Sequence, residues 1–433
     1  MLNMNRKLIK WEAEGKCIKV GVVGAGQMGR GMVVEMVRMH GMKPVALCDM
    51  VIENAFIAYK MAGVADDDIV KANTLEEANR YAEAGRYVVC EDYHIITSMN
   101  AVDCVVDVTG HTDLGAHIAT ETITNHKHIV FLNVEMDVVI GPYLRKMAQD
   151  NGVLYSGTAG DEPGAVMELY DFAKAMGFDV KVMGKGKNNR LDKACNPDTV
   201  AEEAARRKMS PRMLCAFKDG TKTMVEMCAM SDATGLVPDV IGGHGIACDV
   251  KGLNDMYRLK EDGGILNKHG VVEFVNGIAP GVFVTVSTDN AEIAYQMGYH
   301  SMGPGPLWTL YRPYHLCNLE TPLTIAKMVI DGETTIVPKG NLVSEVITVA
   351  KKDLKAGEVI DGLGGYTTYG TIATKEESDA KGYIPYGLVT KGAKMLKDAK
   401  KGQLITWDMM QIDTNTLIYK LRKEQDAHDN KFD

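Results

Sequence analysis

The stretch KVGVVGAGQMG, residues 19–29, decides the fold of this chain, because it joins a short apolar run to a glycine-rich turn. Gly24, Gly26 and Gly29 keep the G-x-G-x-x-G spacing, and an apolar stripe that predicts a helix follows at once. The first glycine allows a tight turn, the second lets the backbone approach a pyrophosphate, and the third lets the helix pack on its strand. The helix N-terminus would hold the phosphates, since its N–H groups and dipole favour anions.

An acidic residue stands where such a turn needs one. Asp49 ends a second apolar run, 44–47, and lies 20 residues beyond Gly29. A carboxylate there can accept hydrogen bonds from the ribose hydroxyls of a dinucleotide. We therefore predict an NAD or NADP site rather than a turn without a ligand. The predicted cofactor-binding residues are Gly24, Gly26, Gln27, Met28, Gly29, Asp49, Thr109, Gly110 and Asn133.

Composition bounds the class of protein. With 433 residues the chain is too long for one core, and we expect two or three domains. A net charge of −9 argues against nucleic acid or an anionic membrane as a partner. Nine dispersed cysteines without C-x-x-C, no signal peptide and no long apolar run favour a cytoplasmic protein with reduced thiols.

The pattern along the chain predicts three domains. Alternating strands and helices over 1–156 predict a doubly wound α/β Rossmann domain. Residues 157–335 predict an α+β substrate-binding and dimerisation domain, of which 319–331 could pack back on the first domain. Short β-branched runs and glycine turns over 336–421 predict a small all-β domain, and 422–433 a polar tail.

The densest supply of cations and amides is KGKNNR, residues 185–190, directly after a predicted strand. Reduction of a carbonyl needs a cation or proton donor at the oxygen. We predict Lys187 as that donor or as a phosphate ligand, and Lys185, Asn188 and Asn189 as substrate-binding residues. A solvated basic loop is the alternative.

A second group is Asp219, Lys222 and Glu226, whose spacing places them on one face of a helix or of its approach. We predict an acid–base pair or a metal-binding carboxylate facing the cleft, with Lys222 as another candidate for stabilising the oxygen. A surface ion pair between Lys222 and Glu226 is the alternative. His244, exposed by flanking glycines, is a candidate substrate ligand, although a structural hydrogen-bonded histidine is the simpler interpretation.

The adjacent acids Asp161 and Glu162 lie in a glycine-rich loop before a predicted helix. They could hold Mg²⁺ or Mn²⁺, which an isomerising reductase needs to polarise a hydroxyketone. A helix cap explains one of them more simply.

The N-terminal two-thirds resembles the homoserine dehydrogenase-like oxidoreductases. The C-terminal third resembles a SAF module, the β-rich fold shared with antifreeze-like domains of sialic acid synthases, in AKKDLKAGEV (350–359), IPYGL (384–388) and KKGQLIT (400–406). The pair is similar to the group that contains 1-deoxyxylulose 5-phosphate reductoisomerase-like enzymes. The resemblance implies an NAD(P)-dependent enzyme, often one that uses NADPH, and by analogy a homodimer.

One position departs from that resemblance. Homoserine dehydrogenases carry a lysine directly after the asparagine, whereas here Val134 and Glu135 follow Asn133. This argues against homoserine as the substrate. Asp49 also favours NAD, because its carboxylate would repel the 2′-phosphate of NADP.

These observations predict an NAD(P)-dependent oxidoreductase acting on a small polar, anionic hydroxycarbonyl compound, with or without a phosphate. A reductoisomerase of the 1-deoxyxylulose 5-phosphate type would require a divalent metal. A simple alcohol dehydrogenase would not. A non-catalytic sensor that only binds the dinucleotide is a third interpretation.

Overall fold

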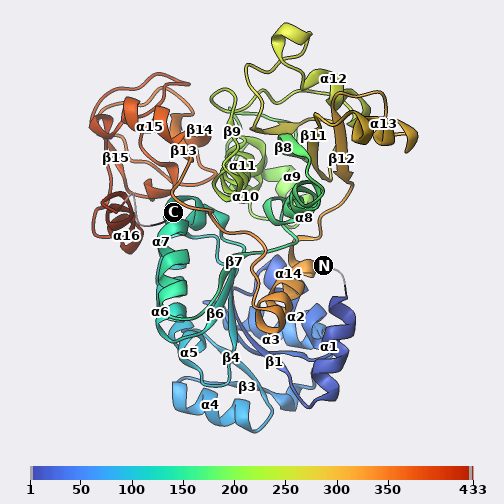
Figure 1. Cartoon of the computed structure of the whole chain (residues 1–433). Coiled ribbons are helices and arrows are strands. Elements are labelled where there is room, and N and C mark those ends of the chain that lie inside the picture. Colours follow the sequence, from blue (N-terminus) through green and yellow to red (C-terminus); the bar gives the residue numbers. More distant parts are fainter. Residues whose placement is uncertain (1–2, 429–431, 433) are drawn as a thin grey trace. The chain divides into compact units, whose positions relative to one another are not determined.

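The computed structural model describes residues 3–428 and residue 432, and it divides into two compact units (Figure 1). The first unit contains the chain up to Gly164 together with Leu316–Val337. The second contains Ala165–His315 and the chain from Pro338 onward. The first unit thus continues beyond the boundary expected at residue 156.

The first unit is built on a seven-stranded sheet in the order β3-β4-β2-β1-β5-β6-β7. All neighbouring strands pair in parallel. The strand order reverses between β1 and β5, which is the switch point where doubly wound sheets bind ligands. The predicted doubly wound Rossmann fold is confirmed. The strands are β1 (Ile18–Val23), β2 (Met42–Cys48), β3 (Ile69–Lys71), β4 (Tyr87–Cys90), β5 (Cys104–Asp107), β6 (His128–Phe131) and β7 (Tyr155–Gly157).

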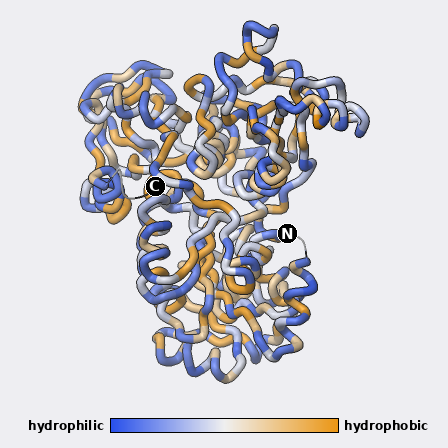
Figure 2. The backbone as a smooth tube through the Cα atoms, viewed as in Figure 1, coloured by the Kyte–Doolittle hydropathy of each residue, from blue (hydrophilic) through white to orange (hydrophobic). Residues whose placement is uncertain are grey.

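Helices alternate with these strands and bury one apolar face each, apart from α7, which is buried on most sides. The helix after the glycine turn buries Met32, Val33 and Met36, as its apolar stripe predicts. Figure 2 shows hydrophobic residues along the strands of the sheet and hydrophilic residues along α4. The helices are α1 (Met4–Ala13), α2 (Gln27–Arg38), α3 (Ile52–Met61), α4 (Leu75–Glu83), α5 (Tyr93–Ser98), α6 (Thr112–Thr124), α7 (Val134–Asp150) and α14 (Cys317–Ala326).

Helix α14 returns from late in the sequence to the first unit. Ile325, Ala326 and Met328 belong to the same buried apolar cluster as α2. The hydroxyls of Thr158 and Thr321 lie 2.7 Å apart, and the Thr324 hydroxyl accepts a hydrogen bond from the backbone N–H of Ala159 at 2.8 Å. Residues 319–331 therefore complete this core.

The second unit contains a five-stranded sheet in the order β12-β11-β8-β10-β9. Strands β8, β10 and β9 are parallel, whereas β11 and β12 run antiparallel to their neighbours. The strands are β8 (Asp179–Gly186), β9 (Val237–Pro238), β10 (Val271–Val275), β11 (Val282–Ser287) and β12 (Trp308–Arg312). The helices of this part of the chain are α8 (Glu162–Ala175), α9 (Ala201–Arg206), α10 (Pro211–Lys218), α11 (Thr221–Thr234), α12 (Leu253–Met256) and α13 (Ala291–Tyr299).

The rest of the second unit is a β-rich module, residues 338–428. It differs from the small all-β domain expected from the sequence because it contains two helices, one after β14 and one after β16. The elements are β13 (Ser344–Ala350), β14 (Thr368–Thr374), α15 (Lys375–Lys381), β15 (Lys394–Met395), β16 (Met410–Gln411) and α16 (Leu417–Asp426).

The expected tail, 422–433, begins inside helix α16. Arg422 is buried and pairs with Glu345 of β13, so the chain is packed at this point rather than frayed. Residues 429–431 and 433 of that tail lie outside the described residues. Among the helices that the structure describes, none combines the length and the apolar character that a membrane crossing requires.

Candidate functional site

The three glycines of the first turn have three different surroundings. Gly24 has a φ of 111°, in the left-handed region, and a Cβ there would lie 3.1 Å from the backbone carbonyl of Val108. A Cβ on Gly29 would lie 1.9 Å from the Gly24 carbonyl oxygen, so only glycine lets α2 start this close to the turn. A Cβ on Gly26 would meet nothing within 4 Å. Open space therefore lies where a pyrophosphate would approach the backbone.

The N-terminus of α2 suits an anion. No side chain caps it, and its first turn contains no acidic residue. Gly26, Gln27 and Met28 are exposed. Backbone N–H groups at an uncapped helix start, together with the helix dipole, attract phosphate oxygens.

Asp49 lies beside this turn, at the carboxyl end of β2. One carboxylate oxygen accepts a hydrogen bond from the N–H of Ala25 at 2.7 Å. The other accepts from the N–H of Val51 at 2.9 Å and from the side-chain amide of Asn54 at 3.2 Å. These bonds hold the carboxylate in one orientation next to the glycines.

The ends of β5 and β6 hold a buried polar group. Asp107 accepts hydrogen bonds from the Thr109 hydroxyl at 2.6 Å and from the Asn133 amide at 3.0 Å. Burial raises the pKa of Asp107 above its usual range. The Asn133 amide also donates to the carbonyl of His111 at 2.9 Å. Gly110 has a φ of 67° and no neighbour near an added Cβ.

The amide oxygen of Asn133 is buried and has no hydrogen-bond partner among the described residues. A buried acceptor is normally paired, and the carboxamide of a nicotinamide offers the N–H group that this oxygen lacks. The open space at Gly26, the uncapped start of α2 and this acceptor all fit a dinucleotide along the carboxyl edge of the sheet.

A buried acid in the same unit was not found from the sequence. Asp137 of α7 accepts a hydrogen bond from the Tyr155 hydroxyl at 2.8 Å. Burial raises the pKa of Asp137 to about 7, against the lowering effect of this hydrogen bond. No sequence pattern marks the pair, because its members come from a helix and a strand 18 residues apart.

The second unit brings three of the predicted residues together. Lys185 lies in β8 and forms a buried ion pair with Glu226 of α11. Lys187 follows β8, and its Nζ donates to the Phe217 carbonyl at 2.7 Å and lies 3.4 Å from the Thr223 hydroxyl. Both lysines are buried. The alternative of a solvated basic loop is therefore wrong for Lys185 and Lys187.

The Lys187 amine is electrostatically unusual. Burial and, to a smaller extent, the charge of Lys185 lower the pKa of Lys187 to about 8. The carboxylates of Glu226 and Asp219 oppose this shift. An amine of this pKa exchanges its proton near neutral pH.

Lys222 and Glu226 lie on α11, and Asp219 lies on the approach to that helix, so the acid–base role of the three stays a prediction. Asp219 is the C-cap of α10, and Gly220, with φ 95°, separates it from α11. The Asp219 carboxylate accepts from Lys351 Nζ at 2.7 Å, in the β-rich module. Sequence reasoning missed Lys351, since nothing local marks a partner 132 residues away.

The alternative interpretation of this group is wrong. Glu226 is 4% exposed and pairs with Lys185, so its carboxylate is buried and does not lie on the surface. Lys222 itself is partly buried on α11.

The remaining substrate-binding candidates have surroundings that differ from those of Lys187. Asn188 is exposed, and the Asn189 amide oxygen accepts a hydrogen bond from Arg207 at 2.9 Å. The backbone N–H of His244 donates to the buried carboxylate of Glu273 at 2.9 Å, and its Nε2 lies 2.7 Å from Asp239. His244 thus has the partners of a structural histidine.

The two acids proposed for a metal lie at the end of the first unit. Asp161 is partly buried in the loop after β7, and its Oδ1 lies 3.8 Å from Cys317 Sγ. Glu162 is the first residue of α8 and is buried. Binding of Mg²⁺ or Mn²⁺ by this pair stays a prediction.

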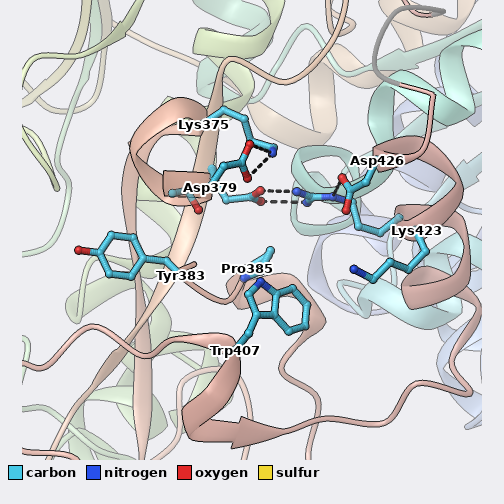
Figure 3. A pocket seen from close by; sticks show the side chains of 10 residues that line it. Lys375, Asp379, Tyr383, Pro385, Trp407, Lys423 and Asp426 are labelled. Atoms are coloured by element: carbon cyan, nitrogen blue, oxygen red, sulfur yellow. Dashed lines mark hydrogen bonds and ion pairs between the residues drawn. The ribbon is translucent and has the colours of Figure 1, made fainter. Parts of the chain in front are cut away.

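A pocket of about 250 Å³ lies in the β-rich module and contains none of the predicted site residues (Figure 3). Its charged side chains largely neutralise one another. Arg422 donates to Glu345 at 3.1 and 2.5 Å and to Asp426 at 2.7 Å, and Lys375 pairs with Asp379. The lining residues are Glu345, Lys375, Ser378, Asp379, Tyr383, Pro385, Trp407, Arg422, Lys423 and Asp426.

Comparison with known proteins adds chemistry to this geometry. Residues 24–156 match the family model described as homoserine dehydrogenase, NAD binding domain. Residues 160–321 match the one described as oxidoreductase DRL, catalytic domain. The first match confirms the homoserine dehydrogenase-like resemblance of the dinucleotide-binding part. Both matches end before the β-rich module, whose SAF resemblance stays a prediction. No curated protein sequence matches the chain.

Among solved structures, scyllo-inositol dehydrogenase from Lactobacillus casei, with bound NAD(H) and scyllo-inositol, is 15% identical with a TM-score of 0.40, over 74% of this chain and 91% of that one. The WlbA dehydrogenase from Bordetella pertussis, in complex with NADH and UDP-GlcNAcA, is 16% identical with a TM-score of 0.28, over 41% of this chain. The chain spans about half of WlbA, 48% of its length. Likeness at this level carries no functional argument.

The class of the enzyme follows from the two domain matches. One covers the glycine turn and the polar strand ends of the first unit, and the other covers buried Lys185 of β8 and Lys187 directly after it. The chain is an NAD(P)-dependent oxidoreductase.

Proposed function

We propose that the protein catalyses reversible hydride transfer between NAD(P) and a small anionic hydroxycarbonyl compound, with Lys187 exchanging the proton at the substrate oxygen. Reduction of a carbonyl needs a hydride at carbon, which a bound reduced nicotinamide supplies, and a proton at oxygen. The observation that carries the proposal is the buried Lys187 amine, whose pKa lies at about 8. A general acid or base works best when its pKa lies near the working pH.

The surroundings of Lys187 support this role. The Phe217 carbonyl and the Thr223 hydroxyl orient its amine. Lys185 adds a second positive charge, neutralised in part by Glu226. Charge that develops on the oxygen of an anionic substrate would be stabilised by this excess of cations. We propose the exposed amide of Asn188 as a further ligand of the substrate.

A reductoisomerase of the 1-deoxyxylulose 5-phosphate type is the second candidate. The buried carboxyl of Glu162 beside Asp161 favours it, because a hydroxyketone rearrangement needs a divalent cation. Treatment with EDTA separates the two reactions. Turnover that survives EDTA would exclude the isomerising one and leave a simple dehydrogenase.

The homodimer and the cytoplasmic location stay predictions. Light scattering of the purified chain tests the first, and fractionation of cells tests the second. A sensor without catalysis would bind NADH or NADPH but oxidise neither with any substrate.

The proposal is tested by following nicotinamide absorbance with NADH or NADPH and a panel of hydroxycarbonyl compounds, phosphorylated and not. With an active substrate, Lys187→Met is expected to lower kcat by about 100- to 10,000-fold, the usual contribution of general acid–base catalysis. Lys181→Met removes a part-exposed lysine of β8, the strand that precedes Lys187, and should leave kcat within about twofold, as expected for a surface change. Full activity of Lys187→Met would refute the proposed role.

A further inference from the structure

Helix α11 is shared by the five-stranded sheet and the β-rich module. Its Glu226 pairs with Lys185 of β8. Two turns further on, the Asp232 carboxylate accepts hydrogen bonds from the N–H groups of Val343 at 2.8 Å and Ser344 at 3.0 Å. The helix that carries part of the candidate site is therefore also anchored to the module.

The loop before α11 is held by the same module. Lys351, directly after β13, donates to Asp219 Oδ2 at 2.7 Å and to the Gly365 carbonyl at 2.9 Å. The N–H of Gly370 in β14 donates to the Thr221 hydroxyl at 3.0 Å. The side chains of Lys351 and Asp219 are 2% and 0% exposed. Neither charge can lose its partner without being left alone in a low-dielectric interior.

The same short segment orients Lys187. The Phe217 carbonyl, two residues before Asp219, accepts from Lys187 Nζ at 2.7 Å. The Thr223 hydroxyl, two residues after Thr221, lies 3.4 Å from that amine. Along residues 217–223, the two contacts of the module, at Asp219 and Thr221, therefore lie between the two contacts of Lys187. A displacement of this segment would move both partners of the amine at once.

We infer that Lys351 is a positioning residue: through its ion pair with Asp219 it fixes residues 217–223 and thereby the orientation of the Lys187 amine. The inference rests on the proposed role of Lys187. It assigns the β-rich module a part in the reaction, although Lys351 acts only through Asp219 and the backbone.

Four groups face the Lys187 amine electrostatically: Lys185 from β8, Glu226 from α11, Asp219 from the loop between α10 and α11, and the Cys195 thiol. Loss of Lys351 leaves Asp219 unneutralised, and a loosened segment admits water to the amine. Both effects raise the pKa of Lys187, because attraction and hydration favour the ammonium form.

The test measures the protonation of Lys187 in the full chain by pH-dependent labelling of amines with acetic anhydride and peptide mass spectrometry. The variants are Lys351→Met and the charge-neutral pair Lys351→Met with Asp219→Asn, which leaves no lone buried charge and so guards against unfolding. Lys355→Met removes an exposed lysine of the same module, paired with Asp398, as the matched control.

We expect the labelling midpoint of Lys187 to rise by about one pH unit or more in Lys351→Met, a tenfold loss of free amine. In the double variant Asp219 no longer attracts the ammonium form, so only water raises the midpoint and the rise should be smaller. Lys355→Met should leave the midpoint unchanged. Calorimetric affinity for NADH should also stay unchanged, because the glycine turn lies in the other unit. A midpoint within about 0.3 unit of wild type in folded Lys351→Met, or no rise at all in the folded double variant, with folding confirmed by circular dichroism, would overturn the inference.

The proposed function can fail separately. If no compound is turned over but the Lys187 midpoint moves with Lys351, the positioning holds and the assigned reaction does not. With an active substrate, both Lys351 variants should lower kcat with little change in the KM for the coenzyme. A kcat equal to that of wild type would count against the positioning even where thermal stability falls.

Discussion

The coenzyme edge of the first unit and the lysine cluster of the second are made of different groups. The coenzyme edge depends on the lack of a side chain at Gly24, Gly26 and Gly29, and on the backbone N–H groups of this turn. The lysine cluster depends on buried charges, in Lys185 with Glu226 and in Lys351 with Asp219. A backbone site is encoded by neighbours in the sequence, whereas a cluster of paired charges is encoded only by the finished fold. The two sites should therefore respond differently to substitution.

The largest effect is expected at the buried pair of the second unit. Lys185→Met leaves the Glu226 carboxylate without its cation, and we expect a loss of about 3–5 kcal/mol in the free energy of unfolding. Lys185→Met combined with Glu226→Met removes both charges, and its stability should return to near that of wild type. Denaturant titration measures both. Equal losses in the single and double variants would show that the pair is held by packing rather than by charge.

The first unit offers a buried carboxyl bound to a hydroxyl instead of a cation. The pKa of Asp137 is raised from 3.8 to about 7, so the folded state holds a proton that the unfolded state releases. The protonated Asp137 carboxyl therefore contributes fully to the free energy of unfolding below about pH 4. This contribution is lost as the pH rises to 7, by at most about 1.4 kcal/mol for each unit by which the pKa is raised. Asp137→Asn should become more stable relative to wild type across that range, by about 2–4 kcal/mol in total.

Measurement of the unfolding free energy of both proteins from pH 4 to 8 checks this. Parallel profiles for wild type and Asp137→Asn would contradict the raised pKa. Asp66→Asn, which changes an exposed carboxylate of the same unit, is the control and should follow wild type.

The glycine turn should separate binding from folding. Gly26→Ala adds a Cβ into open space, so the melting temperature should stay near that of wild type while the Kd for NADH rises about tenfold or more, or at least about 1.4 kcal/mol. Gly29→Ala places a Cβ 1.9 Å from the Gly24 carbonyl and should lower the melting temperature as well. Calorimetry and thermal unfolding distinguish the two. Unchanged coenzyme affinity in Gly26→Ala would show that the phosphates of the coenzyme do not bind at this turn.

The smallest effect concerns the choice of coenzyme. Asp49→Ser removes the charge that repels a 2′-phosphate. The ratio of affinities should shift toward NADPH by about tenfold, or about 1.4 kcal/mol. The carboxylate also holds Ala25 and Val51, so the affinity for NADH should fall in the same variant. An unchanged ratio of affinities would mean that Asp49 stabilises the turn but does not select the coenzyme.

The same contrast explains what could be predicted from the sequence. The glycine spacing and Asp49 identify the coenzyme edge, because each acts within a few residues of a strand end. Thr109 and Asn133 could be placed because parallel strands end at one edge. The partner of Asp219 could not be predicted, since helical spacing shows neither that Gly220 separates two helices nor that Lys351 lies nearby.

The sequence carries no local pattern from which long-range partners or fully buried elements could be predicted. Lys351 lies in a β-branched segment that looks like any exposed strand end. Helix α7 also has no recognisable pattern. It is buried on most sides over Val134–Leu144 and contains Pro142, so it shows no amphipathic period to recognise.

The return of α14 has a consequence for how this protein is made. Ile325, Ala326 and Met328 complete the apolar core of a unit whose other elements all precede residue 165. A ribosome delivers those elements first, so the coenzyme-binding part must wait, with an open apolar face, until more than 150 further residues have been synthesised. A fragment that stops at residue 156 would keep that face uncovered and should be prone to aggregate.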